Sequence, residues 1–400
     1  FVTLQAVVTL GLVPLFISAF GNVSLISPWV NLLAIPIFTA VLVPAVLIGC
    51  CLLLVHVPLG TWWMEHLAEM MNGMYHALQW SANLSMATWY VPQSPFWAMC
   101  LLGVGALLIV LPVLWPMRMC GLLCCLPALL WQPEKLPADA FELAALDVGQ
   151  GLSLVIRTAS HVLVYDTGPK FQGGTDTGAL VVLPYLRSLG VRHVDAVMIS
   201  HGDDDHAGGM RSVAQGLPVK QWMLGPSVGT EQLPQPFNMQ RCQQGQHWQW
   251  DDVQFEVLYP SSSVTEVSRN NTSCVLRISA AGGSALLLGD AEAPVEQQLV
   301  SENRIAPTSI VVAGHHGSRS SSTPELVNAA HAGYVIFSAG YRNRWDFPKA
   351  DVVERWQMSG ARVNSTIDAG AITIRIMPQG IQTPLWYRIP QWHYWQSDSG

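Results

Sequence analysis

The stretch His201-Gly202-Asp203-Asp204-Asp205-His206 contains two histidines and three aspartates within six residues. It directly follows the apolar run 194–200, Val-Asp-Ala-Val-Met-Ile-Ser, which is typical of a buried strand. A strand that ends in two imidazoles and three carboxylates presents nitrogen and oxygen ligands on a single turn. Such ligands suit divalent metals such as zinc or manganese. The hexapeptide therefore predicts a metal site at the end of a strand.

Two further apolar runs also end in metal-ligand side chains. Residues 285–290 read Ala-Leu-Leu-Leu-Gly-Asp and end in Asp290, and residues 310–316 read Ile-Val-Val-Ala-Gly-His-His and end in His315 and His316. Three strand ends of this kind in one chain indicate a dinuclear hydrolase site.

Charge is distributed unevenly along the 400 residues. Of the 20 Lys and Arg residues, Arg118 alone precedes residue 133, and of the 27 Asp and Glu residues, Glu65 and Glu69 alone do. The first third is therefore nearly uncharged, whereas the remainder carries 19 basic and 25 acidic residues. This is not the balance of a strong nucleic-acid binder, so metals and local basic patches would have to attract any DNA that the protein handles.

The first third predicts membrane-spanning helices. Its apolar stretches cover residues 2–20, 32–57, 95–116 and 118–132. A bilayer requires about 20 apolar residues, so the first three stretches are long enough and the fourth is short. We assign residues 1–132 to a multi-pass membrane domain whose upstream part is absent, because the chain starts at Phe1 without a signal peptide. Residues 133–140 form a linker that contains two prolines.

Residues 61–89 show a helical period with one polar face. The polar positions are separated by four and three residues in alternation, and they are Glu65, Glu69, Asn72, His76 and Gln79. Such a helix lies at the membrane surface or lines a polar passage between spans, and the sequence leaves both alternatives open.

The orientation of the membrane domain is predicted from Arg118, which lies in a short turn beside an apolar stretch. A basic residue at that place favours the cytoplasmic side, so the next stretch returns the chain outward and the remainder faces the periplasm or the cell exterior. Cys242 and Cys274 lie in this remainder and could form a disulfide there, but the sequence does not give the distance between them.

Residues 141–380 predict a mixed α/β domain with two sheets and outer helices, followed by a tail at 381–400. The expected strands are 141–148, 153–158, 162–166, 196–200, 220–224, 254–258, 273–279, 285–289, 310–313 and 333–338. The expected helices are 177–189, 210–217, 294–302 and 350–359.

The order of these motifs resembles the metallo-β-lactamase superfamily, whose fold is an αββα sandwich with metals at one edge of its two sheets. Within that superfamily, five motifs are similar to those of the ComEC family. These motifs are Asp-Val-Gly-Gln-Gly at 147–151, Tyr-Asp-Thr-Gly at 165–168, the 201–206 cluster, Leu-Gly-Asp at 288–290 and His-His-Gly-Ser at 315–318. Residues 31–36, Asn-Leu-Leu-Ala-Ile-Pro, with Pro44, also resemble the membrane competence domain of that family.

The resemblance implies which residues of the 201–206 cluster bind metal. The cluster matches the superfamily motif HxHxDH with Asp203 in place of the second histidine, which implies the ligands His201, Asp203, Asp205 and His206. A carboxylate in place of an imidazole hardens the site and favours manganese over zinc. Asp204 is expected to be solvated.

The same resemblance assigns roles at the other strand ends. Asp290 matches the acid that bridges both metals, since its two oxygens can hold two cations roughly 3.5–4 Å apart. Of the adjacent histidines, we expect His315 to be the ligand and His316 to support it or face the phosphate. The expected supporting or substrate-contacting residues further include Asp166, Gln150 and Ser318.

Two positions depart from the family pattern. The superfamily has a further metal-binding histidine between the 201–206 cluster and Asp290. The histidine of this chain in that interval is His247, which is expected to lie in a turn. Asn270 or Asn271 could take the place of this ligand instead. The family motif Tyr-Gly-His-Pro near the end corresponds to Trp-Asp-Phe-Pro here, so Phe347 occupies the histidine position.

The resemblance implies an inner-membrane, multi-pass protein of DNA uptake in natural transformation. One DNA strand would pass through the membrane while the lactamase-like domain, with two divalent cations of manganese or zinc, hydrolyses the other strand. Asp205 would guide the proton of the attacking water. The expected partners are DNA, membrane lipid and other proteins of the uptake machinery. The alternatives are a membrane-tethered metallohydrolase of another phosphoester and a non-catalytic DNA-translocation protein.

Overall fold

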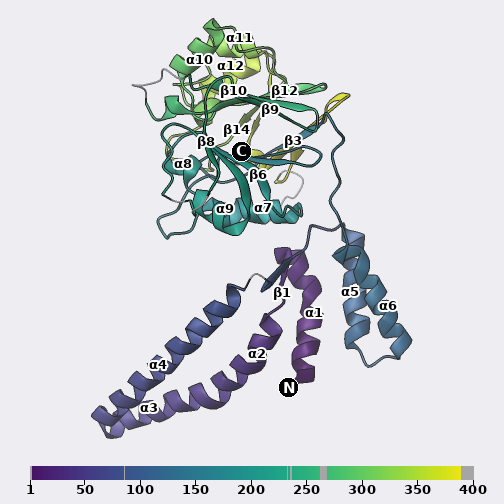
Figure 1. Cartoon of the computed structure of the whole chain (residues 1–400), viewed down its shortest axis with the longest axis vertical. Helices are drawn as coiled ribbons and strands as arrows, with labels where there is room; N and C mark the ends of the chain where they lie inside the picture. The colour runs from purple at the N-terminus through teal and green to yellow at the C-terminus, as the bar shows by residue number, and fades with distance from the viewer. Residues whose placement is uncertain (1, 85, 232, 235–236, 262–267, 389–400) are drawn as a thin grey trace. The chain divides into compact units, whose positions relative to one another are not determined.

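The computed structural model describes residues 2–84, 86–231, 233–234, 237–261 and 268–388 (Figure 1). Of the predicted tail, residues 389–400 lie outside this described part. The chain divides into a helical unit, Phe1–Pro133 with Arg187–Gly190, and a second unit, Glu134–Leu186 with Val191–Gly400.

The helical unit contains two helices that are long and apolar enough to cross a membrane, as far as the structure describes the chain. They are α1 (Val2–Phe20) and the continuous segment Ser27–Val55. That segment joins α2 (Ser27–Pro36), a π-helical stretch (Ile37–Leu42) and α3 (Val43–Val55). The unit also holds α4 (Val57–Ala82), α5 (Phe96–Val110), α6 (Trp115–Leu129) and the paired short strands β1 (Asn22–Ser24) and β2 (Thr88–Tyr90).

The apolar stretch 95–116 is long enough to span a bilayer by residue number, but the helix within it is shorter. α5 has 15 residues and ends at Val110, and Leu111 is extended. Pro112 disfavours helical geometry at the residue before it, which explains the early end. The prediction of an amphipathic helix is confirmed by α4, which exposes its five polar positions and buries Leu67.

The second unit is a sandwich of two sheets. Within its described residues, the nine-stranded sheet has the order β17-β16-β3-β4-β5-β6-β7-β8, with β18 beside β16, and the seven-stranded sheet has the order β15-β14-β13-β12-β11-β10-β9. The strands of the first are β3 (Phe141–Ala145), β4 (Leu154–Arg157), β5 (Val162–Tyr165), β6 (Val194–Ile199), β7 (Val219–Leu224), β8 (Met239–Arg241), β16 (Ile372–Met377), β17 (Gly380–Ile381) and β18 (Leu385–Trp386). The strands of the second are β9 (His247–Trp250), β10 (Val253–Tyr259), β11 (Val275–Ala280), β12 (Gly283–Leu287), β13 (Ile310–Val312), β14 (Tyr334–Phe337) and β15 (Arg362–Ser365).

Helices cover the outer face of each sheet (Figure 1). A π-helical stretch (Gly178–Val182), α7 (Leu183–Ser188) and α9 (Met210–Gly216) pack on the nine-stranded sheet. α10 (Ala293–Ser301), α11 (Pro324–Ala330) and α12 (Ala350–Met358) pack on the seven-stranded sheet. Alternate side chains of both sheets meet between them in a shared core that includes Leu154, Tyr165, Met198, Phe255, Leu276 and Leu287. The predicted αββα sandwich is therefore confirmed.

All ten predicted strands are present with ends shifted by a few residues, but several elements were missed. They include the strands β8, β9, β15, β16, β17 and β18 and the helices α8 (Asp204–Ala207), α11 and α13 (Thr366–Ala369). The prediction that His247 lies in a turn was wrong, because it is the first residue of β9 and pairs with Glu256 of β10. Trp248 and Trp250 face the core and His247 faces outward, so the strand follows a period of two that its many polar residues concealed.

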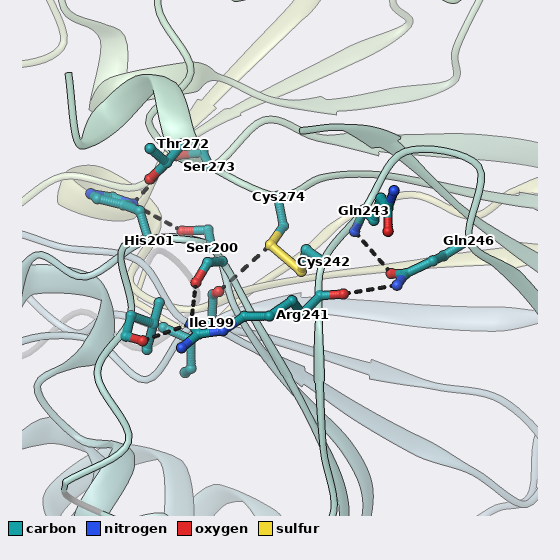
Figure 2. Close-up of a disulfide and its surroundings, with 12 residues drawn as sticks. Ile199, Ser200, His201, Arg241, Cys242, Gln243, Gln246, Thr272, Ser273 and Cys274 are labelled. Carbon is teal, nitrogen blue, oxygen red and sulfur yellow. Dashed lines mark hydrogen bonds between the residues drawn. A yellow bond between two sulfur atoms is a disulfide. The ribbon is translucent and has the colours of Figure 1, made fainter. Parts of the chain in front are cut away.

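A disulfide joins Cys242 and Cys274, whose Cα atoms are 6.0 Å apart. Cys242 follows β8 of one sheet and Cys274 precedes β11 of the other, so the bond links the two sheets within their shared core. Figure 2 shows the disulfide beside the segment Ile199–His201, which leads from β6 into the metal-ligand cluster.

Candidate metal centre

The predicted ligand residues follow strands whose carboxyl ends lie at one edge of the sandwich. β5 and β6 are parallel, and they lead into Asp166 and the 200–206 loop. β12 and β13 are also parallel, and they lead into Asp290 and the 313–316 loop. The carboxyl ends of parallel strands share one edge of a sheet, and His206 Nε2 lies 3.0 Å from Asp290 Oδ1, so the edges of the two sheets meet.

Asp166 fixes the orientation of His206. Its side chain is fully buried and its backbone is left-handed, with φ of 59°. Asp166 Oδ2 lies 2.7 Å from His206 Nδ1, and the carboxylate also accepts hydrogen bonds from the backbone N–H and the hydroxyl of Ser200. Because Nδ1 is turned to this carboxylate, Nε2 of His206 faces the cluster.

His316 is oriented in the same way from the opposite sheet. Its Nδ1 donates to the backbone carbonyl of Ser338 at 2.8 Å, since a carbonyl can only accept. Its Nε2 therefore faces the cluster and lies 3.3 Å from His206 Nε2 and 3.3 Å from Asp205 Oδ2. Left-handed backbone at both His315 and His316 turns the loop so that this side chain enters the cluster.

Four side chains thus converge on one point, and they fit a metal ion. Ligand atoms of Asp205, His206, Asp290 and His316 lie within 4.8 Å of one another. With both Nδ1 atoms turned to acceptors, the two imidazole Nε2 atoms and the two carboxylates face one another. His201 adds a buried Nε2 that has no hydrogen-bond partner within the described part of the chain. A divalent cation is the species that such a set of ligands satisfies.

The charges of the cluster also favour a bound cation. Burial disfavours a charged imidazole, but the carboxylates of Asp290 and Asp166 outweigh burial and raise the pKa of His206 well above its ordinary value. Burial also disfavours the ionised form of Asp205, but the hydrogen bond from His316 and the charge of His206 lower the pKa of Asp205 to about 2. The centre of the cluster therefore favours positive charge, which a metal cation supplies.

His201 and Asp203 lie beside this group. The His201 ring is fully buried, 4.2 Å from the ring of His206, and its Nε2 is 3.8 Å from Asp203 Oδ2. Asp203 is partly exposed and pairs with Arg269 at 3.3 Å. Asp204 is exposed, as expected. His201 and Asp203 extend the cluster on one side.

The structure brings His316, rather than its neighbour, into the convergent group. His315 Nε2 is 3.9 Å from Asp290 Oδ2, and its Nδ1 is 3.3 Å from Glu292 Oε1. Sequence reasoning missed Glu292, although it follows the Leu-Gly-Asp motif by two residues. Its carboxylate accepts from Ser320 Oγ at 2.8 Å, so Glu292 holds His315 at the rim of the centre.

Asn270 and Asn271, the alternatives to the superfamily histidine that this chain lacks, lie on the same rim as His315. Asn271 is buried, and its Oδ1 accepts the backbone N–H of Glu292 at 3.0 Å. Asn270 Nδ2 is 3.5 Å from His315 Nε2. His247 is exposed on β9, and it is not a member of the convergent group.

Three further predicted residues lie around the site. Gln150 Oε1 accepts the backbone N–H of Gly340 at 3.2 Å, so it supports the loop after β14. Ser318 Oγ is 3.1 Å from Ser320 Oγ, next to the Glu292 contact. The ring of Phe347, at the position of the family histidine, lies 5.7 Å from the His315 ring.

Two protein-family models match separate parts of the chain, one in the helical unit and one in the sandwich domain. Residues 1–116 match the model of the competence protein family, and residues 146–340 match that of the metallo-β-lactamase superfamily. The chain combines a competence-family segment with a metallo-β-lactamase domain. This is the organisation expected from the resemblance to the ComEC family, and that prediction is confirmed.

Among curated proteins, the competence protein ComA of Neisseria gonorrhoeae is 32% identical over 367 residues, which are 91% of this chain and 50% of ComA. The uncharacterized protein YcaI of Escherichia coli is 32% identical over 98% of this chain and 51% of its own length. The chain therefore spans about half the length of the curated relatives it matches. Among solved structures, the metallo-β-lactamase fold protein YhfI from Bacillus subtilis is 11% identical and aligns with 57% of this chain and 96% of its own, with a TM-score of 0.38.

Proposed function

We propose that the metallo-β-lactamase domain is a metal-dependent phosphodiesterase that degrades nucleic acid during DNA uptake. The observation that carries the proposal is the convergence of Asp205, His206, Asp290 and His316, whose ligand atoms lie within 4.8 Å of one another. The match of residues 1–116 to the competence protein family supports DNA as the substrate class.

The residues of the cluster would hold one or two divalent cations. Asp205, His206, Asp290 and His316 form one ligand group, and His201 with Asp203 would complete a second. When bound, the cations supply positive charge to the phosphate and acidify water in the site. His206 and His316 keep their Nε2 atoms directed inward because Asp166 and the Ser338 carbonyl occupy their Nδ1 atoms. His315 stays predicted as a ligand, and its place at the rim also suits contact with substrate.

Asp205 is the residue of the group best placed to meet the attacking water. Its side chain is 33% exposed, whereas those of Asp290 and His316 are 4% and 3% exposed. With its pKa lowered to about 2, it is ionised at neutral pH and accepts a hydrogen bond from water. We propose that it orients this water towards phosphorus and guides its proton.

We also propose that the protein is a multi-pass protein of the inner membrane and that this domain faces the extracytoplasmic side. The apolar helices Val2–Phe20 and Ser27–Val55 support the membrane location. The disulfide between Cys242 and Cys274 supports an oxidising compartment, because disulfides are rare in the reducing cytosol.

The test is hydrolysis by the full chain purified in detergent micelles. The substrates are single-stranded DNA, double-stranded DNA and bis(p-nitrophenyl) phosphate, each with manganese, with zinc or with EDTA. We expect DNA cleavage with a metal, none with EDTA, and loss of cleavage in the double variant Asp205→Ala, His206→Ala. The matched control is Asp204→Ala, because Asp204 is an exposed neighbour outside the convergent group.

Each outcome distinguishes one function. DNA cleavage that the double variant loses and the Asp204 control keeps would support the proposal. Cleavage of the small ester without cleavage of DNA would favour a metallohydrolase of another phosphoester. Tight binding of manganese without hydrolysis of any substrate would refute the catalytic proposal and favour a domain that guides DNA.

A further inference from the structure

The loop Gly340–Lys349, which joins β14 to α12, lies at the rim of the metal centre and exposes aromatic rings. Phe347 contacts His315 with ring centroids 5.7 Å apart. Trp345 stacks beside Phe347 at 6.3 Å with an interplanar angle of 10°. The Trp345 side chain is 42% exposed. A continuous row of rings therefore runs from His315 outward to the surface.

Three cations accompany these rings. The Arg344 guanidinium lies 4.1 Å above the Trp345 ring, that of Arg342 lies 5.2 Å from the Tyr341 ring, and the Lys349 ammonium lies 5.8 Å from the Phe347 ring. Among the ion pairs of the described residues, these three cations have no carboxylate partner. Their charge is thus available to an anion, in a unit that carries more acidic than basic residues.

The loop is held in place by hydrogen bonds to itself and to the metal centre. The Asn343 amide donates to the carbonyl of Phe347 at 2.7 Å, and its Oδ1 accepts the N–H of Phe347 at 2.9 Å. At the ends of the loop, Gly340 N–H donates to Gln150 and Lys349 N–H donates to the Gly317 carbonyl. Gly317 directly follows His316, so the loop is fixed relative to the metal ligands before any ligand binds.

We propose that the loop Gly340–Lys349 is a single-stranded nucleic-acid platform that feeds the phosphodiester backbone into the metal centre. This inference rests on the proposed function for its substrate class. Exposed aromatic rings stack on unpaired bases, and stacked arginines bind phosphate while presenting a flat face. A duplex keeps its bases stacked on one another and offers no free base face to Trp345. An acidic peptide would use the cations but would leave the row of rings without a partner.

The test measures binding by fluorescence anisotropy, with the full chain in detergent micelles and with EDTA present so that no strand is cut. The probes are a labelled 20-mer of deoxythymidine, a 20-mer of abasic sites and a 20-base-pair duplex. We expect the wild type to prefer the thymidine strand over both other probes. Trp345→Ala should weaken binding of the thymidine strand on the order of tenfold and leave abasic binding unchanged. Trp345→Phe should restore most of the preference.

The cations are tested by salt dependence. The double variant Arg342→Ala, Arg344→Ala should lower the slope of log affinity against log salt by about 1.4, because each phosphate contact on a single strand contributes about 0.7. The matched control is Lys135→Ala, Arg192→Ala. These exposed cations precede β3 and β6, at the opposite edge of the nine-stranded sheet, and their removal should leave the slope unchanged.

Equal binding of thymidine and abasic strands by the wild type would overturn the proposal, as would preference for the duplex or absence of binding. A control double variant that loses as much affinity as the loop variant would also overturn it. The proposed function is judged separately by metal-dependent cleavage of DNA by the wild type, and the Trp345 variants should retain hydrolysis of bis(p-nitrophenyl) phosphate. Base-dependent binding without hydrolysis would support the platform and refute the phosphodiesterase. DNA cleavage by the wild type, with unchanged binding in the Trp345 variants, would support the phosphodiesterase and refute the platform.

Discussion

Removal of the disulfide between Cys242 and Cys274 should destabilise the metallo-β-lactamase domain strongly. The two residues are separated by 32 positions, and both are buried. Cross-linking a loop of this length lowers the entropy of the unfolded chain by about 12 cal/mol/K, or about 3.7 kcal/mol at 25 °C. This is a large fraction of the roughly 5–15 kcal/mol that stabilises a typical domain.

The disulfide also lies beside the segment Ile199–His201, which leads into the candidate metal-ligand cluster (Figure 2). The backbone N–H of Cys274 donates to the Ser200 carbonyl at 3.0 Å, and its carbonyl accepts from the Tyr165 hydroxyl at 2.6 Å. The preceding residue, Ser273, accepts the backbone N–H of Asp290 at 3.1 Å. Loss of the disulfide should therefore loosen both the 200–206 loop and Asp290, and we expect weaker manganese binding together with lower stability.

The assay is urea unfolding of the full chain in detergent, followed by tryptophan fluorescence, for the wild type and for Cys242→Ala, Cys274→Ala. The double variant should lose about 3.7 kcal/mol, and a reducing agent should bring the wild type to the same midpoint without affecting the variant. Cys50→Ala, an exposed free cysteine of the helical unit, is the control and should respond to reducing agent as the wild type does. A midpoint that neither reduction nor the double substitution shifts would refute the reasoning.

Three further perturbations test the supporting contacts. Asp166→Asn should lower manganese affinity roughly 10- to 100-fold by calorimetric titration, because His206 loses its orienting carboxylate. Burial acts to raise the pKa of Asp251, but hydrogen bonds from the 158–161 turn hold that pKa well below its usual value. The stability lost in Asp251→Asn should therefore be constant above about pH 5 and should shrink as the pH falls below about 4 in urea titrations. Glu296→Ala should cost about 2–4 kcal/mol in urea unfolding, because two buried backbone amides lose their acceptor.

Local patterns predicted the strands that carry the site. β6 and β13 are fully buried and β12 is buried from Ala285 to Leu287, and a continuous apolar run identifies such strands without further information. Strands at the sheet margins were harder to predict. β9 has exposed polar residues at alternate positions, and its packing partner, Phe255, lies on the next strand. Its character as a strand depends on that pairing rather than on its own composition.

Two features can be recognised from the order of residues alone: residues of metal-ligand type follow several buried strands, and an apolar, nearly uncharged region precedes them. Both are properties of neighbouring residues along the chain. Three other features follow from tertiary packing: His316 rather than His315 enters the convergent group, Glu292 contacts His315, and Cys242 bonds to Cys274. These outcomes depend on left-handed backbone at the loop after β13 and on how the two sheets pack, which no local pattern contains.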